Sequence, residues 1–126
     1  MNGNGHSSRF SSSVLQVLVG SGRTVFVDVT ADWCITCKIN KAFVIQRHEI
    51  TARLTSDVVP MRADWTKPDT EIAQFMREHG RFGIPFNIVF GPKATGGIAL
   101  SEILSTSSLS AAFNDAAAAS TNPLQK

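Results

Sequence analysis

The chain contains two cysteines, Cys34 and Cys37, and the two residues between them give a spacing that suits redox chemistry. Two thiols one helical turn apart can close a disulfide and reopen it by exchange with the disulfide of another protein. At the first turn of a helix, unpaired N–H groups and the positive end of the helix dipole stabilise a thiolate, which is the attacking species. We therefore predict a redox-active pair in which Cys34 is exposed and attacks, and Cys37, one turn deeper, resolves the mixed disulfide.

Three other interpretations of the cysteine pair are a structural disulfide, a degenerate pair and a zinc site. A structural disulfide with this spacing would close a very small loop and constrain little of the unfolded chain. A zinc site needs two more ligands, but His6 lies in a polar N-terminal stretch, and His48 and His79 are too far apart for a zinc finger. We expect no metal and no cofactor.

Asp28 is the second residue that could take part in this chemistry, because it interrupts an apolar run at residues 24–30. Burial would raise its pKa and make it a usable base near neutral pH, able to accept the proton of Cys37. The alternative is an acid on the solvent face of an edge strand. Trp33 is predicted to shield one side of Cys34, with a plain core position as its alternative.

The elements that must position these residues follow from composition and periodicity. Residues 24–30, 58–64, 86–90 and 98–100 are predicted strands, the second less secure because of Pro60. Predicted helices span 14–19 after a cap at 11–13, then 38–47, 48–54, 70–79 after Asp69, and a last helix after Ser107 or Ser108. This order predicts an α/β sandwich, a mixed sheet flanked by helices.

The length of 126 residues predicts one domain, at residues 14–119, between a flexible tail or linker at 1–13 and a second tail at 120–126. Twelve basic and ten acidic residues give a net charge of +2, which does not indicate a nucleic-acid-binding protein. No apolar stretch approaches the roughly 18 residues of a membrane span, so we expect no membrane insertion of this chain.

The sequence also resembles a known family. The segment Trp33-Cys34-Ile35-Thr36-Cys37, preceded by Phe26-Val27-Asp28, is similar to the active-site signature of thioredoxin-like proteins. Residues 27–40, Arg62-Ala63-Asp64-Trp65-Thr66 and residues 79–86 resemble one branch, the C-terminal domain of DsbD-type thiol:disulfide interchange proteins. The resemblance covers about residues 14–117 and implies a thioredoxin-like three-layer sandwich.

The resemblance also implies roles for several residues. Asp28 would lie beneath Cys37, and the Ile84–Pro85 bond would be cis and face the cysteines. Trp33, Ile84 and Pro85 would then contact the substrate, with the backbone at Pro85 pairing with an extended substrate strand.

At two positions the chain departs from its relatives. Phe86 replaces the small polar residue that often follows this proline in thioredoxins, so their substrate preference is not transferable. Lys41 stands where some DsbD relatives carry an acid, which puts a second carboxylate role in doubt.

By this resemblance the chain is a monomeric thiol:disulfide oxidoreductase domain, a protein-disulfide reductase. It would take electrons from a membrane electron-donor domain and pass them to periplasmic acceptor proteins. It would then be a soluble periplasmic piece of a longer inner-membrane protein. Two alternatives stay open: a free-standing thioredoxin or disulfide isomerase, and a non-catalytic binding module with the same fold.

Overall fold

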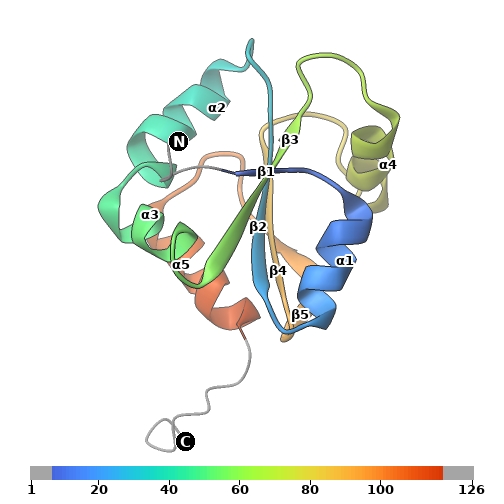
Figure 1. The fold of residues 1–126 in the computed structure, drawn as a ribbon. Helices are drawn as coiled ribbons and strands as arrows, with labels where there is room; N and C mark the ends of the chain where they lie inside the picture. The colour runs from blue at the N-terminus through green and yellow to red at the C-terminus, as the bar shows by residue number, and fades with distance from the viewer. Residues whose placement is uncertain (1–6, 118–126) are drawn as a thin grey trace, which may run out of the picture.

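The computed structural model describes residues 7–117 as a sheet with helices on both faces (Figure 1). Its strands are β1 (Ser8–Arg9), β2 (Thr24–Thr30), β3 (Val58–Asp64), β4 (Phe86–Gly91) and β5 (Ala94–Ala99). Its helices are α1 (Ser12–Gly20), α2 (Ile35–Asn40), α3 (His48–Leu54), α4 (Thr70–Glu78) and α5 (Thr106–Ala116). A π-helical segment, η1 (Lys41–Ile45), continues α2 directly.

The strands form one mixed sheet in the order β1-β3-β2-β4-β5. β1, β3 and β2 run parallel to one another, whereas β4 is antiparallel to β2 and β5 is antiparallel to β4. β2 therefore lies at the centre of the sheet. The predicted α/β sandwich with a mixed sheet and flanking helices is confirmed.

Side chains alternate along β2 and divide the interior into two cores. Val25, Val27 and Val29 belong to the core on the side of α1 and α4, whereas Phe26 belongs to the core on the side of α3 and α5. Figure 1 shows α2 on the same side of the sheet as α3 and α5. Asp28 shares the face of Phe26, so its carboxyl group lies on the side of the sheet that carries the cysteines.

The N-terminal segment is more ordered than the sequence indicates. Residues Ser8 and Arg9 pair with β3, and the Phe10 N–H donates to the Arg62 carbonyl at 2.8 Å. The Phe10 ring is 6% exposed and lies 4.8 Å from the Phe75 ring, measured between centroids. The prediction of a flexible tail is therefore wrong for residues 7–13, because one buried aromatic ring and the free edge of β3 hold them. Residues 1–6 and the predicted tail at 120–126 lie outside the described residues.

Other differences from the predictions lie at element ends. β5 begins at Ala94 instead of residue 98, and α5 begins at Thr106 because Ser105, not a later serine, accepts the capping hydrogen bond. β3 runs through Pro60 as a regular strand. β1 pairs with β3 only from Met61 onward. Pro60 therefore has a partner residue on β2 and none on β1.

Candidate active site

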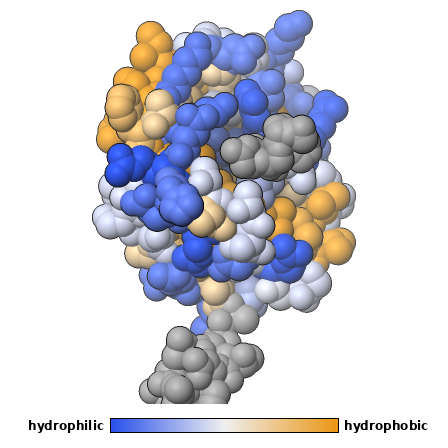
Figure 2. Space-filling model, turned by 60° about the vertical axis from the view of Figure 1, so that its left-hand side comes forward, coloured by the Kyte–Doolittle hydropathy of each residue, from blue (hydrophilic) through white to orange (hydrophobic). Residues whose placement is uncertain are grey.

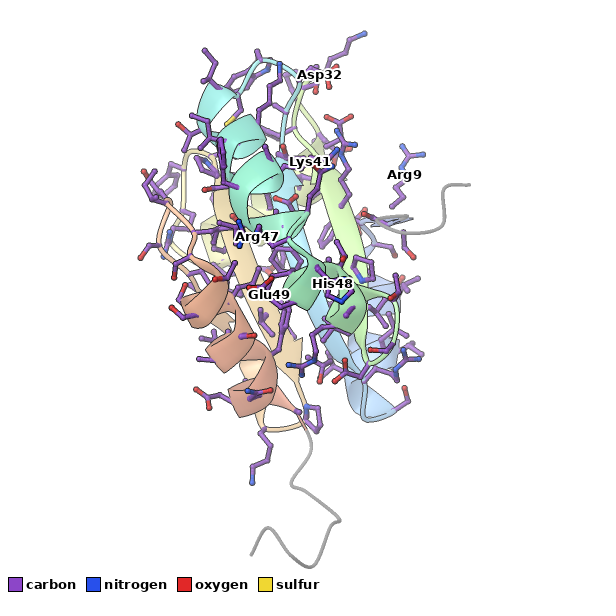
Figure 3. All side chains as sticks on the ribbon, turned by 90° about the vertical axis from the view of Figure 1, so that its left-hand side faces the viewer. Arg9, Asp32, Lys41, Arg47, His48 and Glu49 are labelled. Atoms are coloured by element: carbon purple, nitrogen blue, oxygen red, sulfur yellow. A yellow bond between two sulfur atoms is a disulfide. The ribbon has the colours of Figure 1, made fainter. Side chains whose placement is uncertain are left out.

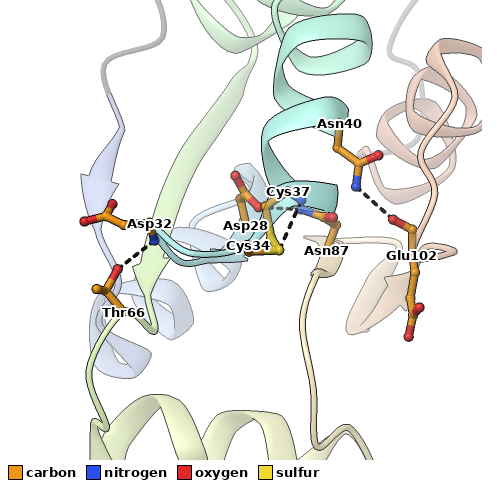
Figure 4. Close-up of a disulfide and its surroundings, with 8 residues drawn as sticks. All are labelled: Asp28, Asp32, Cys34, Cys37, Asn40, Thr66, Asn87 and Glu102. Atoms are coloured by element: carbon orange, nitrogen blue, oxygen red, sulfur yellow. Dashed lines mark hydrogen bonds between the residues drawn. A yellow bond between two sulfur atoms is a disulfide. The ribbon is translucent and has the colours of Figure 1, made fainter.

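Cys34 and Cys37 are joined by a disulfide where α2 begins (Figure 4). Cys34 is the N-cap of α2, and its Sγ accepts a hydrogen bond from the Cys37 N–H at 3.1 Å. The Cys34 N–H in turn donates to the Ala31 carbonyl at 3.1 Å. A backbone donor aimed at the Cys34 sulfur stabilises negative charge on it. The geometry therefore favours Cys34 as the attacking sulfur, the role predicted for it.

Exposure does not distinguish the two cysteines in this disulfide state. Cys34 is 5% exposed and Cys37 is 6% exposed. Both belong to a small apolar cluster with Ala31, against which Trp65 and Ile84 pack. The prediction that Cys34 is the exposed member is therefore wrong for the oxidised protein, because these neighbours cover both residues alike.

Trp33 precedes Cys34 in the chain, and Ile84 of the proline segment packs against the cluster. Trp33 is 59% exposed, and its Nε1 donates to the Thr66 carbonyl at 3.2 Å, so it is not a core residue. The Ile84–Pro85 peptide bond is cis, as predicted, and Ile84 packs against the cysteine cluster.

Asp28 lies in a row of polar residues that crosses the centre of the sheet. In the strand register, Asp28 of β2 is opposite Arg62 of β3 and opposite Asn87 of β4. The Asn87 Nδ2 donates to Asp28 Oδ1 at 2.7 Å (Figure 4). Asp28 is thus not on an edge strand, and the alternative of a solvent-face acid on an edge strand is wrong.

A cavity of about 240 Å³ is lined by both Asp28 and Cys37. Its lining includes Asp28, Cys37, Lys41 and Arg62. Burial raises the pKa of Asp28, and the hydrogen bond from Asn87 and the positive charges of Arg62 and Lys41 oppose that rise. The predicted direction of the pKa change and its cause are confirmed. A carboxylate with a raised pKa beside Cys37 can accept a proton from it.

Two further charged residues lie near the site. Lys41 is exposed and also lines the cavity, so its ammonium group adds positive charge near Asp28 (Figure 3). The side chain of Asp32 is 77% exposed, and its carboxylate lies 4.0 Å from the Arg62 guanidinium. Its backbone N–H donates to Thr66 Oγ1 at 2.9 Å, which fixes the turn before Cys34.

Two residues of the polar row were not predicted from the sequence. The sequence predicts a strand around Asn87 and a family motif that includes Arg62, and it assigns neither residue to the site. A signal for Asn87 was available, because an amide in the run Phe86-Asn87-Ile88-Val89-Phe90 is as unusual as an aspartate in residues 24–30. What the sequence does not give is the register that places the two interruptions opposite each other.

The surface around the active site is partly apolar. Trp33, Ile35 and Phe82 are exposed large apolar residues, at 59%, 72% and 83%. Figure 2 shows apolar groups at the upper end of the molecule, the end near which α2 lies in Figure 1. Within residues 7–117, no three His, Cys, Asp or Glu side chains are grouped so that they could hold a metal ion. In the same range, no helix is both long and apolar enough to cross a bilayer.

Sequence comparison places these features among known proteins. The family model described as Thioredoxin-like matches residues 9–92. Two curated relatives called thiol:disulfide interchange protein DsbD, from Yersinia enterocolitica serotype O:8 / biotype 1B and from Ralstonia nicotianae, are 30% identical over 69 and 76 residues. The matches cover 55% and 60% of this chain and 12% of the length of each relative, so the chain corresponds to a small part of those proteins.

Structure comparison finds the same fold. The C-terminal domain of Neisseria meningitidis DsbD matches in its reduced form with a TM-score of 0.66 and 19% identity, over 86% of this chain and 98% of that domain. Its oxidised form matches with a TM-score of 0.67 and 18% identity, over 88% and 99%. A thioredoxin from Thermus thermophilus matches with a TM-score of 0.63 and 18% identity, over 86% and 85%. With a family model that covers more than half of its length, this chain belongs to the thioredoxin-like family.

Proposed function

We propose that this chain is a thiol:disulfide oxidoreductase domain that reduces disulfides of partner proteins through Cys34 and Cys37. One observation carries the proposal: the disulfide lies at the start of α2, next to a cavity lined by a partly buried carboxyl group, that of Asp28, with a raised pKa. The thioredoxin-like fold and the similarity to DsbD support thiol–disulfide exchange as the reaction.

In the proposed reaction, the reduced protein starts with a Cys34 thiolate and a Cys37 thiol. The thiolate attacks one sulfur of a partner disulfide, forms a mixed disulfide and releases the other partner sulfur as a thiolate. Cys37 then gives its proton to Asp28 and attacks Cys34, which forms the Cys34–Cys37 bond and breaks the bond to the partner. The two electrons pass to the partner, which leaves with two reduced sulfurs.

We further propose that Trp33, Ile84 and Pro85 contact the partner beside the disulfide. Trp33 is exposed next to Cys34, and Ile84 packs against the cysteine cluster, so both are placed to meet a chain that approaches the sulfurs. The backbone at Pro85 would pair with an extended segment of the partner.

The relatives suggest a physiological setting for this exchange. By similarity to DsbD, the electrons would come from a membrane electron-donor domain and pass to periplasmic acceptor proteins. The chain would then act as a soluble, monomeric periplasmic domain of a longer inner-membrane protein.

The direction of transfer is tested by the reduction potential. Equilibration with a glutathione buffer, followed by alkylation of free thiols, is expected to give a potential nearer the thioredoxin value of about −270 mV than the DsbA value of about −120 mV. The reduced protein should also reduce insulin, and the Cys34→Ser variant should not. A potential near the DsbA value would instead support an oxidase or isomerase.

A trapping experiment separates the reductase from a binding module with the same fold. In Cys37→Ser the resolving sulfur is absent, so Cys34 should accumulate as a mixed disulfide with a model partner such as a peptide disulfide. The adduct should disappear on addition of dithiothreitol, and Cys34→Ser/Cys37→Ser should form none. An intact Cys37→Ser protein that forms no adduct would support the binding-module alternative.

The role of Asp28 is tested by the Asp28→Asn variant, whose amide cannot accept the proton of Cys37. The first attack by Cys34 should be nearly unchanged, while resolution should slow at neutral pH and recover as the pH rises and Cys37 ionises without help. Stopped-flow measurement of mixed-disulfide formation and decay separates the two steps. Equal slowing of both would show that Asp28 has a structural role.

A further inference from the structure

Asn87 is a buried amide that the proposed reaction does not yet use. It is 1% exposed, and every other residue of β4 is apolar or glycine. Its Nδ2 donates to Asp28 at 2.7 Å, but among the described residues its Oδ1 has no hydrogen-bond partner. An unpaired polar atom inside a protein is unfavourable, and an apolar side chain would avoid it. Packing alone therefore does not account for an amide at this position, and its one side-chain hydrogen bond points to Asp28.

The amide has two ends of nearly equal shape, and each suits one protonation state of Asp28. The NH₂ end is a donor, so it bonds to an ionised carboxylate. The oxygen end is an acceptor, so it bonds to the O–H of a protonated carboxyl group. A half-turn about the Cβ–Cγ bond of Asn87 exchanges the two ends, and this bond has a broad, roughly two-fold rotational preference.

Resting on the proposed function, we propose that Asn87 is a positioning residue that holds Asp28 in both protonation states during resolution. While Asp28 is ionised, the Asn87 N–H holds the carboxylate. When the proton leaves the Cys37 thiol and binds Asp28, the amide turns and its Oδ1 accepts the new O–H. The Cys37 sulfur meanwhile bonds to Cys34, and the partner leaves as a thiolate.

Among the described residues, Asn87 is the side chain that hydrogen-bonds to Asp28, at 2.7 Å. Arg62 on β3 and Lys41 on η1 act on Asp28 as positive charges, and Cys37 on α2 lines the same cavity. Lys38 and Asp32 line that cavity as well. Ammonium and guanidinium groups only donate, so neither can accept a hydrogen bond from a protonated Asp28. An amide can do both.

The first test follows the two side chains directly, in the oxidised protein and without any catalytic assay. Carboxyl ¹³C NMR would give the titration of Asp28, and ¹⁵N NMR would follow the side-chain amide of Asn87 in the same samples. We expect the Asn87 amide resonances to shift with the same midpoint as Asp28. Amide resonances that stay constant while Asp28 titrates would overturn the proposal.

The second test replaces the amide. Asn87→Leu has a similar size but can neither donate nor accept, so the pKa of Asp28 should rise as the ionised form loses its donor. Below that pKa, resolution of the mixed disulfide should slow by about tenfold, the order expected for one hydrogen bond to a charged group. The pH at which resolution reaches half of its maximum should move upward, while the first attack by Cys34 is unchanged.

Val89→Ala is the matched control for Asn87→Leu. Val89 is fully buried on the same face of β4, one pair further along, opposite Phe26. It should lower stability without moving the titration of Asp28 or the pH profile. A shift of equal size in both variants would overturn the role of Asn87. If the wild type reduces no disulfides but the Asn87 amide still follows Asp28, the proposed function fails and the Asp28–Asn87 coupling stands.

Discussion

The sulfur of Cys34 accepts a backbone hydrogen bond at the start of α2. The N-cap position directs the Cys37 N–H at Sγ, whereas Cys37 lies within the first turn of α2 and lines the cavity with Asp28. Because the two residues are equally buried in the oxidised state, we expect electrostatics to set any difference in their reactivity. Helix-start donors lower the pKa of a thiol, and a nearby carboxylate raises it.

We predict that iodoacetamide modifies Cys34 in the reduced, folded protein about tenfold or more faster than Cys37, since only thiolates react and one pKa unit is a tenfold change in thiolate. Peptide mapping after a short pulse would measure this. The unfolded protein in denaturant is the control, in which both cysteines should react alike. Faster modification of Cys37 in the folded state would reverse the assigned roles.

A second prediction concerns stability and pH. The pKa of Asp28 is raised in the folded protein, so the folded state holds its proton more tightly than the unfolded state. Wild-type stability is therefore lost as the pH rises from the ordinary aspartate pKa through the raised value. The side-chain amide that Asp28→Asn introduces does not titrate and can still pair with the amide of Asn87.

The measurement is the difference in unfolding free energy between Asp28→Asn and the wild type, from urea titrations at several pH values. The variant should gain stability relative to the wild type as the pH rises through that window. Above the window, the difference in unfolding free energy should stay constant. Asp32→Asn, at an exposed position, is the control and should show no such trend. A pH-independent difference for Asp28→Asn would contradict the burial of a charged carboxylate.

The residues that sequence analysis identified are those whose chemistry is visible locally. Cys34 and Cys37 stand out by spacing, Asp28 by its apolar neighbours, and Pro85 by resemblance. Asn87 and Arg62 join the site only through the pairing of β2 with β4 and β3, which depends on contacts far apart in the chain. Side-chain exposure at Cys34 likewise depends on Trp65 and Ile84, which come from distant loops.

Among the elements, α2 is short and depends on other parts of the chain for its position. It spans six residues and then widens into η1, where the Gln46 N–H donates to the Lys41 carbonyl at 2.9 Å. Asn40, 3% exposed, holds the end of α2: its Nδ2 donates to the Glu102 carbonyl at 2.8 Å, and its Oδ1 accepts from the Leu104 N–H at 3.1 Å. Figure 4 shows the first of these bonds beside the disulfide.

We predict that Asn40→Ala lowers the free energy of unfolding by about 2–3 kcal/mol, because it leaves the Leu104 N–H and the Glu102 carbonyl without their partner. Urea denaturation would measure the loss. Lys38→Ala, exposed on the same helix, is the control and should change stability by no more than about 0.5 kcal/mol. A loss for Asn40→Ala no larger than that of the control would show that the two bonds are dispensable.

The ends of several elements and the existence of β1 could not be predicted from the sequence, and each has a physical reason. The bounds of β2, β3 and α3 match the predicted ranges, since their apolar patterns are strong and their ends are marked. β1 has two residues with polar or charged side chains, so no local pattern identifies it. It exists because β3 offers a free edge and because Phe10 finds a place in the core.

On the scale of the whole molecule, the N-terminal segment is part of the domain. Phe10 packs against Phe75 of α4 and belongs to the core beneath α1 and α4. We predict that Phe10→Ala lowers the free energy of unfolding by about 3 kcal/mol, the usual loss for a buried phenylalanine. Thermal and urea denaturation would measure it. Val17→Ala, on the exposed face of α1, is the control and should have little effect. A negligible loss of stability in Phe10→Ala would support the prediction of a flexible N-terminal tail.

The bonds of Asn40 have a mechanical consequence. In a mixed disulfide, a second protein is covalently attached to Cys34, and its thermal tumbling pulls on the first turn of α2. This helix has six residues and continues directly into η1, so its own hydrogen bonds join it only to neighbouring residues of the chain. The Asn40 side chain connects the end of α2 to the segment before α5, which is far away in the sequence. The two bonds of Asn40 thus connect the helix that Cys34 caps to a part of the chain more than sixty residues away.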